Sequence, residues 1–258
     1  GWVLHPLDEE LRKTSANGKL RCIPVRVLFN DPDLNLRAEY SLFERQTGRA
    51  ICVGNGETCK RFTQSGMQTL PCPSPDCCDI GRNGQCKPYG RLNVKVGDDD
   101  ELGTFIFRTT GFNSIRTLAA RLSYYQAVSG DLLACLPLQL RLRGKSTTQS
   151  HRSAIYYVDL TIRDGMTFEG AIMDAQKLTA RRKECGYNQL ALDDAARKGF
   201  ENAAFEFSED ETPAIVEEFY PDADDSTDMD IEPNAKPAVS LRPSLKEKLD
   251  RKTTLLTP

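Results

Sequence analysis

The chain has 258 residues and a net charge of −3, and 39% of its residues are hydrophobic and 28% charged. This length suits one large domain or two small ones, and no apolar run approaches the roughly 18 residues of a membrane-spanning helix. The opening GWVLHPLDEELRK lacks the basic segment and long apolar core of a secretory signal, so we expect a cytoplasmic protein.

Charge is unevenly divided along the chain. From Ser208 onward there are 13 acidic and six basic residues, whereas the preceding part has 24 acidic and 28 basic residues. A mildly basic body is compatible with a nucleic-acid partner. Because residues 208–258 are acidic and rich in proline, we expect a mostly disordered tail in which Pro213 interrupts any helix.

Alternating and β-branched residues predict strands in the first half of the chain, at 20–30, 36–45, 49–55, 91–96 and 103–110. The turn-forming DPDLN between the first two makes a hairpin plausible. Residues 54–90 are instead rich in Gly, Pro and Cys and show little periodicity. A loop of that length inside a compact domain needs its own organiser.

The second half of the chain has the clearest helical pattern. In 113–128, apolar residues such as Leu118 and Leu122 recur at helical spacing. Strands are predicted at 136–143 and 154–162, and helices at 167–185 and 189–205. We therefore expect an α+β domain over residues 1–207, with a mainly antiparallel sheet and two or three helices, followed by the acidic tail at 208–258.

Six of the nine cysteines lie in one stretch: Cys52, Cys59, Cys72, Cys77, Cys78 and Cys86. A secreted disulfide scaffold is usually shorter and spreads its cysteines over the chain. Zinc prefers four thiolate or imidazole ligands, and neither histidine, His5 or His151, is near this stretch. We predict a structural Zn²⁺ site in the loop at about 54–90, with these ligands: Cys59, Cys72, Cys78 and Cys86. Cys77 is the alternative to Cys78, and Cys52 is interpreted as buried.

Other chemistries for the thiols stay open, namely free or redox-active cysteines and an iron–sulfur cluster. A nucleophilic cysteine would need a histidine base, and His151 is the one candidate in the body of the chain. The acidic turn that begins at Asp98 is interpreted as a solvated hairpin tip rather than a cation site. No motif of a known catalytic class is present, so we expect a protein that is not an enzyme.

Basic residues border the cysteine-rich stretch and continue toward the helix at 113–128. They are the predicted contacts to nucleic acid or to an acidic protein partner: Lys60, Arg61, Arg82, Lys87, Arg91, Arg108 and Arg116.

The run CPSPDCCDIGRNGQCKPYGRLNVKV, followed by ELGTFIFRTTGFNSIRTLAARLSYY, resembles the recombination directionality factor-like family over about residues 20–165. That family includes the phage factor that redirects a large serine integrase from integration to excision. The resemblance implies a zinc-binding, non-enzymatic protein that acts in DNA recombination of a mobile element by binding a recombinase, DNA or both. The alternative is a nucleic-acid-binding module, such as a single-strand binder or a subunit of an RNA-guided complex.

Overall fold

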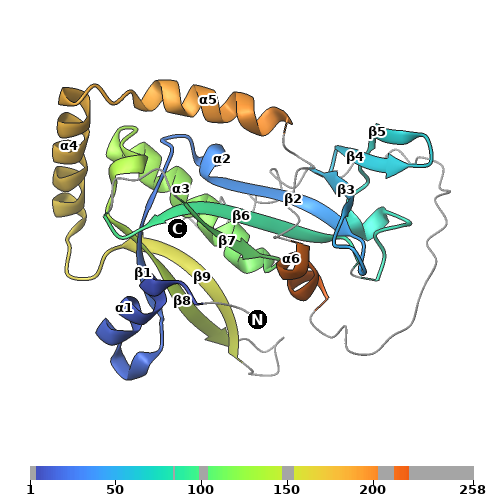
Figure 1. Cartoon of the computed structure of the whole chain (residues 1–258), viewed down its shortest axis with the longest axis horizontal. Helices are drawn as coiled ribbons and strands as arrows, with labels where there is room; N and C mark the ends of the chain where they lie inside the picture. Colours follow the sequence, from blue (N-terminus) through green and yellow to red (C-terminus); the bar gives the residue numbers. More distant parts are fainter. Residues whose placement is uncertain (1–3, 84, 99–103, 147–153, 203–211, 221–258) are drawn as a thin grey trace. The chain divides into compact units, whose positions relative to one another are not determined.

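A computed structural model of the chain describes residues 4–83, 85–98, 104–146, 154–202 and 212–220. The elements labelled in Figure 1 belong to two compact units, each assembled from three separated segments. The first unit comprises residues 1–36, 92–107 and 117–193. The second comprises residues 37–91, 108–116 and 194–258.

The sheet of the first unit is antiparallel and contains β1 (Cys22–Val27), β8 (Leu138–Ser146), β9 (Ala154–Ile162) and the second half of β6 (Lys87–Val96). β1 pairs with β6 on one side and with β8 on the other, and β8 pairs along its whole length with β9. The predicted hairpin of 20–30 with 36–45 is therefore wrong.

A short helix occupies the place of the predicted turn after β1. Asp31 accepts a hydrogen bond from the backbone N–H of Asp33 at 3.0 Å, and Pro32 starts α2 (Pro32–Asn35), which suits a helical first turn. The side chain of Asn35 is fully buried and accepts from the backbone N–H groups of Leu28 and Phe29, at 3.1 and 3.0 Å. These hydrogen bonds join residues within the segment 28–35. The two strands that pair with β1, β6 and β8, come from distant parts of the chain.

The core of the first unit lies between this sheet and α3 (Phe112–Ser129). Leu118 and Leu122 of α3 are fully buried, as their helical spacing predicted. They belong to a core whose strand residues are Val25, Val27, Leu92, Val94, Leu138, Leu140 and Leu160. Aliphatic side chains from these strands and from α3 therefore make up most of this core.

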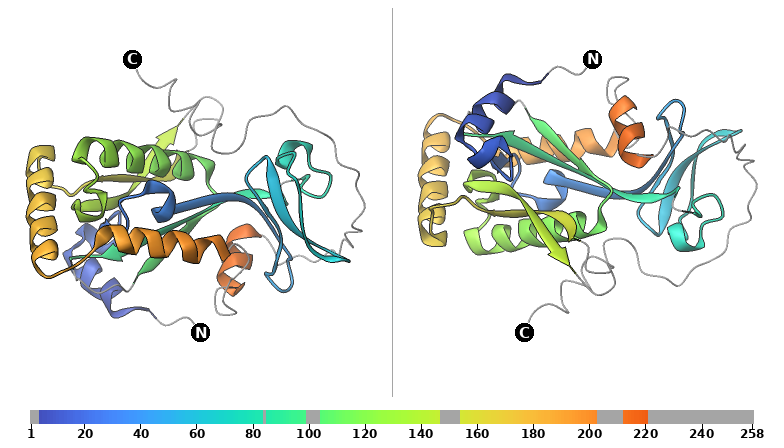
Figure 2. Two further views of the ribbon diagram at one scale, coloured as in Figure 1. Left: turned by 90° about the horizontal axis from the view of Figure 1, so that it is seen from above. Right: turned by 90° about the horizontal axis from the view of Figure 1, so that it is seen from below.

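Three further helices contribute to the first unit: α1 (Pro6–Thr14), α4 (Phe168–Glu184) and the start of α5 (Gln189–Asn202). Thr167 caps α4 by accepting from the backbone N–H of Gly170 at 3.1 Å, and Ala171 and Ala175 bury one face of α4 in the core. Figure 2 shows that α4 runs across α3 rather than along it.

The second unit contains β2 (Leu36–Phe43), β3 (Ala50–Gly54), β4 (Thr58–Thr63), β5 (Gly66–Pro71) and the first half of β6, in the order β5-β4-β3-β2-β6. Strand β7 (Phe105–Thr109) pairs with β6. The expectation of one irregular loop over 54–90 is wrong for residues 58–71, because β4 and β5 form a regular hairpin. Gly66, at φ +92°, makes its tight turn possible.

The second unit also contains α6 (Thr212–Phe219), which the prediction for the tail did not include. Pro213 does not interrupt this helix because it lies in the first turn, where its missing N–H costs no hydrogen bond. Ile215 and Phe219, one helical turn apart, are fully buried. The remaining residues of the predicted tail, 208–211 and 221–258, lie outside the described part of the chain.

The predicted α+β class with a mainly antiparallel sheet is confirmed, and the helices expected at 113–128, 167–185 and 189–205 correspond to α3, α4 and α5. Among the described residues, α1, α2 and α6 are additional helices. No described helix combines the length and apolar character needed to cross a membrane. The predicted boundary at residue 207 stays a prediction.

Candidate functional site

Five cysteines of the second unit gather beside the β4–β5 hairpin, and we call them the thiol cluster: Cys52, Cys59, Cys72, Cys78 and Cys86. Cys52 lies on β3 and Cys59 on β4, while Cys72 follows β5 directly. Cys52, Cys59 and Cys78 are buried, as the sequence predicted for Cys52. The hairpin therefore brings thiols together that are up to 34 positions apart in the chain.

Two glycines let the backbone approach the sulfur atoms closely. A Cβ added to Gly54 would lie 3.0 Å from the Cys72 sulfur and 2.6 Å from the Cys59 Cβ. One added to Gly81 would lie 2.8 Å from the Cys86 Cβ and 3.6 Å from the Cys78 sulfur. These contacts divide the four predicted ligands into two pairs, each packed around a glycine that no larger residue could replace without a shift.

Hydrogen bonds among the thiols shift their pKa values in opposite directions. The Cys59 thiol hydrogen-bonds to Cys72 and lowers the pKa of Cys72 to about 6, helped by the backbone N–H groups of Ser74 and Gly56. Cys59 likewise lowers the pKa of Cys52 to about 7, and its own pKa is raised by the same two bonds. Burial raises the pKa of Cys86. Backbone N–H groups directed at a sulfur stabilise a thiolate, the form that binds a metal.

Arg61 is the cation nearest to these sulfurs. Its Nη2 lies 3.7 Å from the Cys78 sulfur and 4.0 Å from the Cys59 sulfur, and its Nε is buried without a hydrogen-bond partner. A guanidinium in this position offsets negative charge on the sulfur atoms. Arg61 was predicted to contact an external partner, whereas in the structure its guanidinium contacts the thiol cluster.

Cys77, the alternative ligand to Cys78, lies at the end of a short 3₁₀ turn, Pro75–Cys77, and its backbone N–H donates to the carbonyl of Ser74 at 3.1 Å. The chemistry of the thiol cluster suits zinc, because all of its donor atoms are sulfur. Two of the predicted ligands pack against Gly54 and the other two against Gly81. In the described residues, however, no group of three or more His, Cys, Asp or Glu is arranged to hold a metal ion. Zinc binding therefore stays a prediction.

The predicted basic residues of the second unit differ in exposure and in their partners. Lys60 and Arg82 are exposed, and Arg82 pairs with Asp79. Lys87 donates to the carbonyl oxygen of Phe219 and lies near the rings of Phe219 and Tyr220. The other predicted contacts are half-buried: Arg91, which lies 3.8 Å from Glu39, and Arg108 and Arg116.

The histidine and aspartate candidates have structural roles where they are described. His5 caps α1 by accepting from the backbone N–H of Leu7 at 3.3 Å, while His151 lies outside the described residues. Asp98 was interpreted as a solvated hairpin tip, yet it pairs with Arg26 at 2.9 Å and Arg163 at 2.7 Å. These two arginines lower the pKa of Asp98 to about 2, with Arg163 contributing most.

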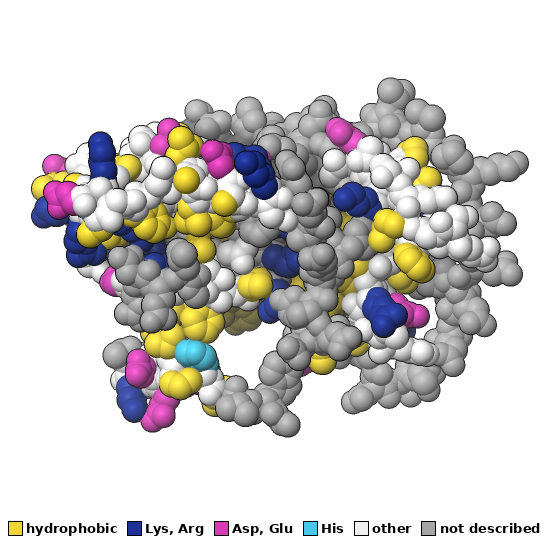
Figure 3. All heavy atoms as spheres, turned by 45° about the horizontal axis from the view of Figure 1, so that its top comes forward, with side chains coloured by type: hydrophobic (Ala, Val, Ile, Leu, Met, Phe, Trp, Pro, Cys, Tyr) yellow, Lys and Arg dark blue, Asp and Glu magenta, His cyan; other side chains and the backbone are white. Residues whose placement is uncertain are grey.

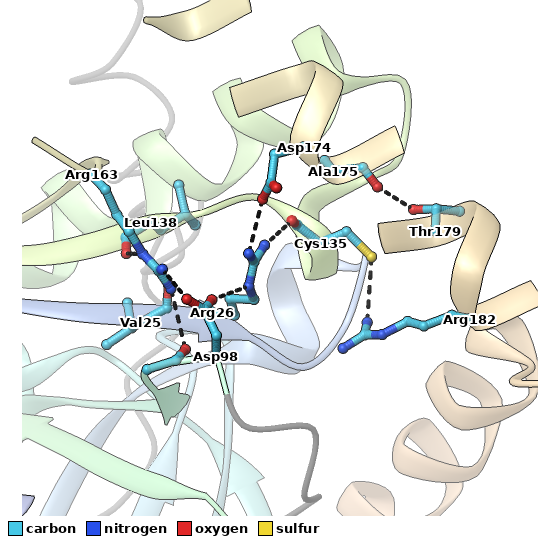
Figure 4. Close-up of polar contacts among 11 residues, drawn as sticks. Val25, Arg26, Asp98, Cys135, Leu138, Arg163, Asp174, Ala175, Thr179 and Arg182 are labelled. Atoms are coloured by element: carbon cyan, nitrogen blue, oxygen red, sulfur yellow. Dashed lines mark hydrogen bonds and ion pairs between the residues drawn. The ribbon is translucent and has the colours of Figure 1, made fainter. Parts of the chain in front are cut away.

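The sequence predictions missed a buried arginine in the first unit. Arg26 lies between the core residues Val25 and Val27, and it is only 8% exposed. Its three guanidinium nitrogens bind Asp98, Asp174 of α4 and the carbonyl oxygen of Cys135, as Figure 4 shows. A charged residue inside an apolar strand was the one available signal, because burying it requires partners.

The family model described as Gp3-like, recombination directionality factor-like, matches residues 4–163, which is more than half of the chain. No curated protein and no solved structure matches the chain.

Proposed function

Because the chain belongs to the recombination directionality factor-like family, we propose that it regulates DNA recombination in a mobile element and catalyses no reaction itself. The family match is the observation that carries this proposal. A regulator of this kind binds a recombinase and shifts its balance between conformations. It can do so only by binding one conformation more tightly than another.

The β4–β5 hairpin of the second unit supplies a surface for such a partner. Phe62 and Met67 are opposite each other across the two strands and are 64% and 47% exposed. Lys60 is exposed on the same face of β4. Exposed aromatic and methionine side chains are enriched at protein–protein contacts, so this pair supports binding to a protein.

Zinc is the second part of the proposal, with Cys59, Cys72, Cys78 and Cys86 as its ligands. The thiol cluster supports it, because these four sulfur atoms belong to segments that Gly54 and Gly81 allow to approach. Four thiolates would close the coordination shell, so the ion would order the segment around the hairpin and activate no water.

Elemental analysis of the purified, reduced protein tests the metal. We expect about one zinc per chain in the wild type and in Cys77→Ser, which serves as the matched control, and a loss of zinc in Cys78→Ser. A metal-free wild type would contradict the proposal. Full zinc content in Cys78→Ser would remove Cys78 from the ligand set.

Capture of a partner tests the recombination role. Tagged protein, expressed in its host with neighbouring genes intact, should recover a serine recombinase, and purified protein should shift that enzyme between integration and excision products. The double variant F62A/M67A should lose capture, whereas Tyr156→Ala, at an exposed position of the first unit, should retain it. Failure to recover a recombinase, together with an unchanged product ratio, would contradict the role.

The alternative, a nucleic-acid-binding module, is favoured by the exposed cations Lys60 and Arg82. It predicts that the protein binds DNA or RNA on its own, with an affinity that falls steeply as salt increases. The directionality role predicts weak binding to nucleic acid alone and tight binding to the recombinase, so a salt titration distinguishes the two.

A further inference from the structure

A cavity of about 330 Å³ lies in the first unit, beside α4, and the proposed function does not use it. Its volume is within the range of about 300–1,000 Å³ that small-ligand pockets occupy. Seven of its lining residues are charged. Five are cationic, namely Arg26, Lys95, Lys177, Arg181 and Arg182, and the other two are Asp98 and Asp174.

Both carboxylates of the cavity are engaged by Arg26. Its Nε lies 2.9 Å from Asp98 and its Nη2 lies 2.9 Å from Asp174. Figure 4 shows Arg26 between these two side chains, and Arg163 binds Asp98 from the other side. Arg26, Asp98 and Asp174 therefore form one wall of the cavity. Both carboxylates in that wall are already paired with arginine.

The remaining cations come mainly from one face of α4. Lys177 and Arg181 are one helical turn apart and exposed, and Leu178 and Arg182 form the next row. Arg182 is held in place, because its Nη1 lies 3.4 Å from the Cys135 sulfur and its guanidinium stacks over Tyr187 at 5.0 Å. Dark-blue Lys and Arg side chains gather at the end of the molecule where α4 lies in Figure 3.

We propose that this cavity binds a phosphate group. The lining cations exceed the lining carboxylates by three, and charges around a partly enclosed space attract a counter-anion more strongly than charges on an open surface. Arginine and lysine together bind the oxygens of a doubly charged phosphate through charge-assisted hydrogen bonds. The group belongs either to a small free ligand or to a nucleic-acid backbone.

The test uses the full chain and two probes, inorganic pyrophosphate followed by calorimetry and a fluorescent 20-nucleotide single strand followed by anisotropy. The variant K177E/R181E reverses two exposed cavity charges. The control K183E/K198E makes the same change in net charge at exposed positions that do not line the cavity. Circular dichroism and thermal unfolding of all three proteins confirm that the fold is retained.

We expect the wild type to bind at least one probe and K177E/R181E to bind it about tenfold more weakly, while K183E/K198E stays within about twofold of the wild type. Binding of the oligonucleotide alone assigns the phosphate to a nucleic-acid backbone, and binding of pyrophosphate assigns it to a small ligand. The inference fails when the wild type binds neither probe, or when both variants weaken binding equally. Partner capture through the second unit is measured separately, so either proposal can fail alone.

Discussion

The two units of this protein are held together by different kinds of side chain. The first has a core of leucine and valine between a sheet and α3, with a network of arginines and aspartates beside it. The second has a group of aromatic rings around α6 and a cluster of thiols beside a hairpin. The buried core of the first unit is mainly aliphatic, whereas the second unit adds two local devices to its core.

Those two devices are the thiol cluster and the helix α6. Phe219 of α6 contacts Phe43 and Tyr89, with ring centroids 4.6 and 5.1 Å away. The hydroxyl of Tyr220 donates to the carbonyl oxygen of Phe43 at 2.7 Å. Because the cores of the two units differ in chemistry, we expect each unit to lose stability in response to a different change.

Removal of the proposed zinc ion has the largest expected effect, because binding of a structural zinc supplies on the order of 10 kcal/mol to small metal-dependent folds. We expect a chelator to abolish hydrogen-exchange protection in residues 52–86 and to leave residues 117–146 and 154–193 protected. Hydrogen exchange read by mass spectrometry measures both regions in one sample. Equal loss in both regions, or no loss in either, would contradict a zinc-dependent second unit.

The substitution Phe219→Ala should destabilise the second unit by about 3–5 kcal/mol, because it leaves a cavity among buried aromatic rings. The matched control is Phe62→Ala, since Phe62 is 64% exposed on β4 of the same unit. Native-state hydrogen exchange of β2 and β3 at increasing urea concentration measures the stability of the second unit in both variants. A Phe219→Ala protein as stable as the control would show that α6 is not part of the core.

In the first unit, Leu138→Ala should cost about 2–5 kcal/mol, because Leu138 is fully buried in the aliphatic core. Leu142→Ala on the same strand is the control, and Leu142 is 44% exposed. We expect the loss to appear in hydrogen exchange of β8 and β9 and not in residues 52–71. Loss of protection in both places would mean that the units unfold as one.

The smallest expected effect concerns Asp98. Its folded pKa, about 2, is below the ordinary carboxyl value of 3.8, so its ion pairs stabilise the first unit above about pH 4. That stabilisation should be lost as the pH falls from about 4 to about 2. Asp98→Asn should flatten this part of the stability curve, whereas the exposed Asp194→Asn should leave it unchanged. If the stability of Asp98→Asn falls between about pH 4 and about pH 2 as much as that of the wild type, the ion pairs of Asp98 contribute nothing to stability.

Helical periodicity was enough to predict α3, α4 and α5 from the sequence, because a buried helix face repeats within a few residues. The crowding of six cysteines in 52–86 likewise predicted that thiols would meet. The partners of β1 could not be predicted, since they come from β6 and β8. Pairing between strands far apart in the chain leaves no local pattern.

The same limit explains the two features that were missed. α6 is short, and only its burial against Phe43 and Tyr89 makes it stable, which the local sequence does not reveal. The network around Arg26 joins positions 26, 98 and 174, so the local sequence of Arg26 could signal a buried charge but could not identify its partners. Sequence patterns therefore located the thiols, but they did not locate the cations of the first unit.

The interleaved segments of the two units have a consequence for synthesis of the chain. Proteins emerge from the ribosome N-terminal end first, and compact units fold as they are completed. The second unit begins at residue 37, but Phe219, which fills its aromatic core, is added 182 residues later. Phe43 and Tyr89 are therefore synthesised 176 and 130 residues before Phe219. Until Phe219 is added, their rings lack this partner and are a surface to which a chaperone can bind.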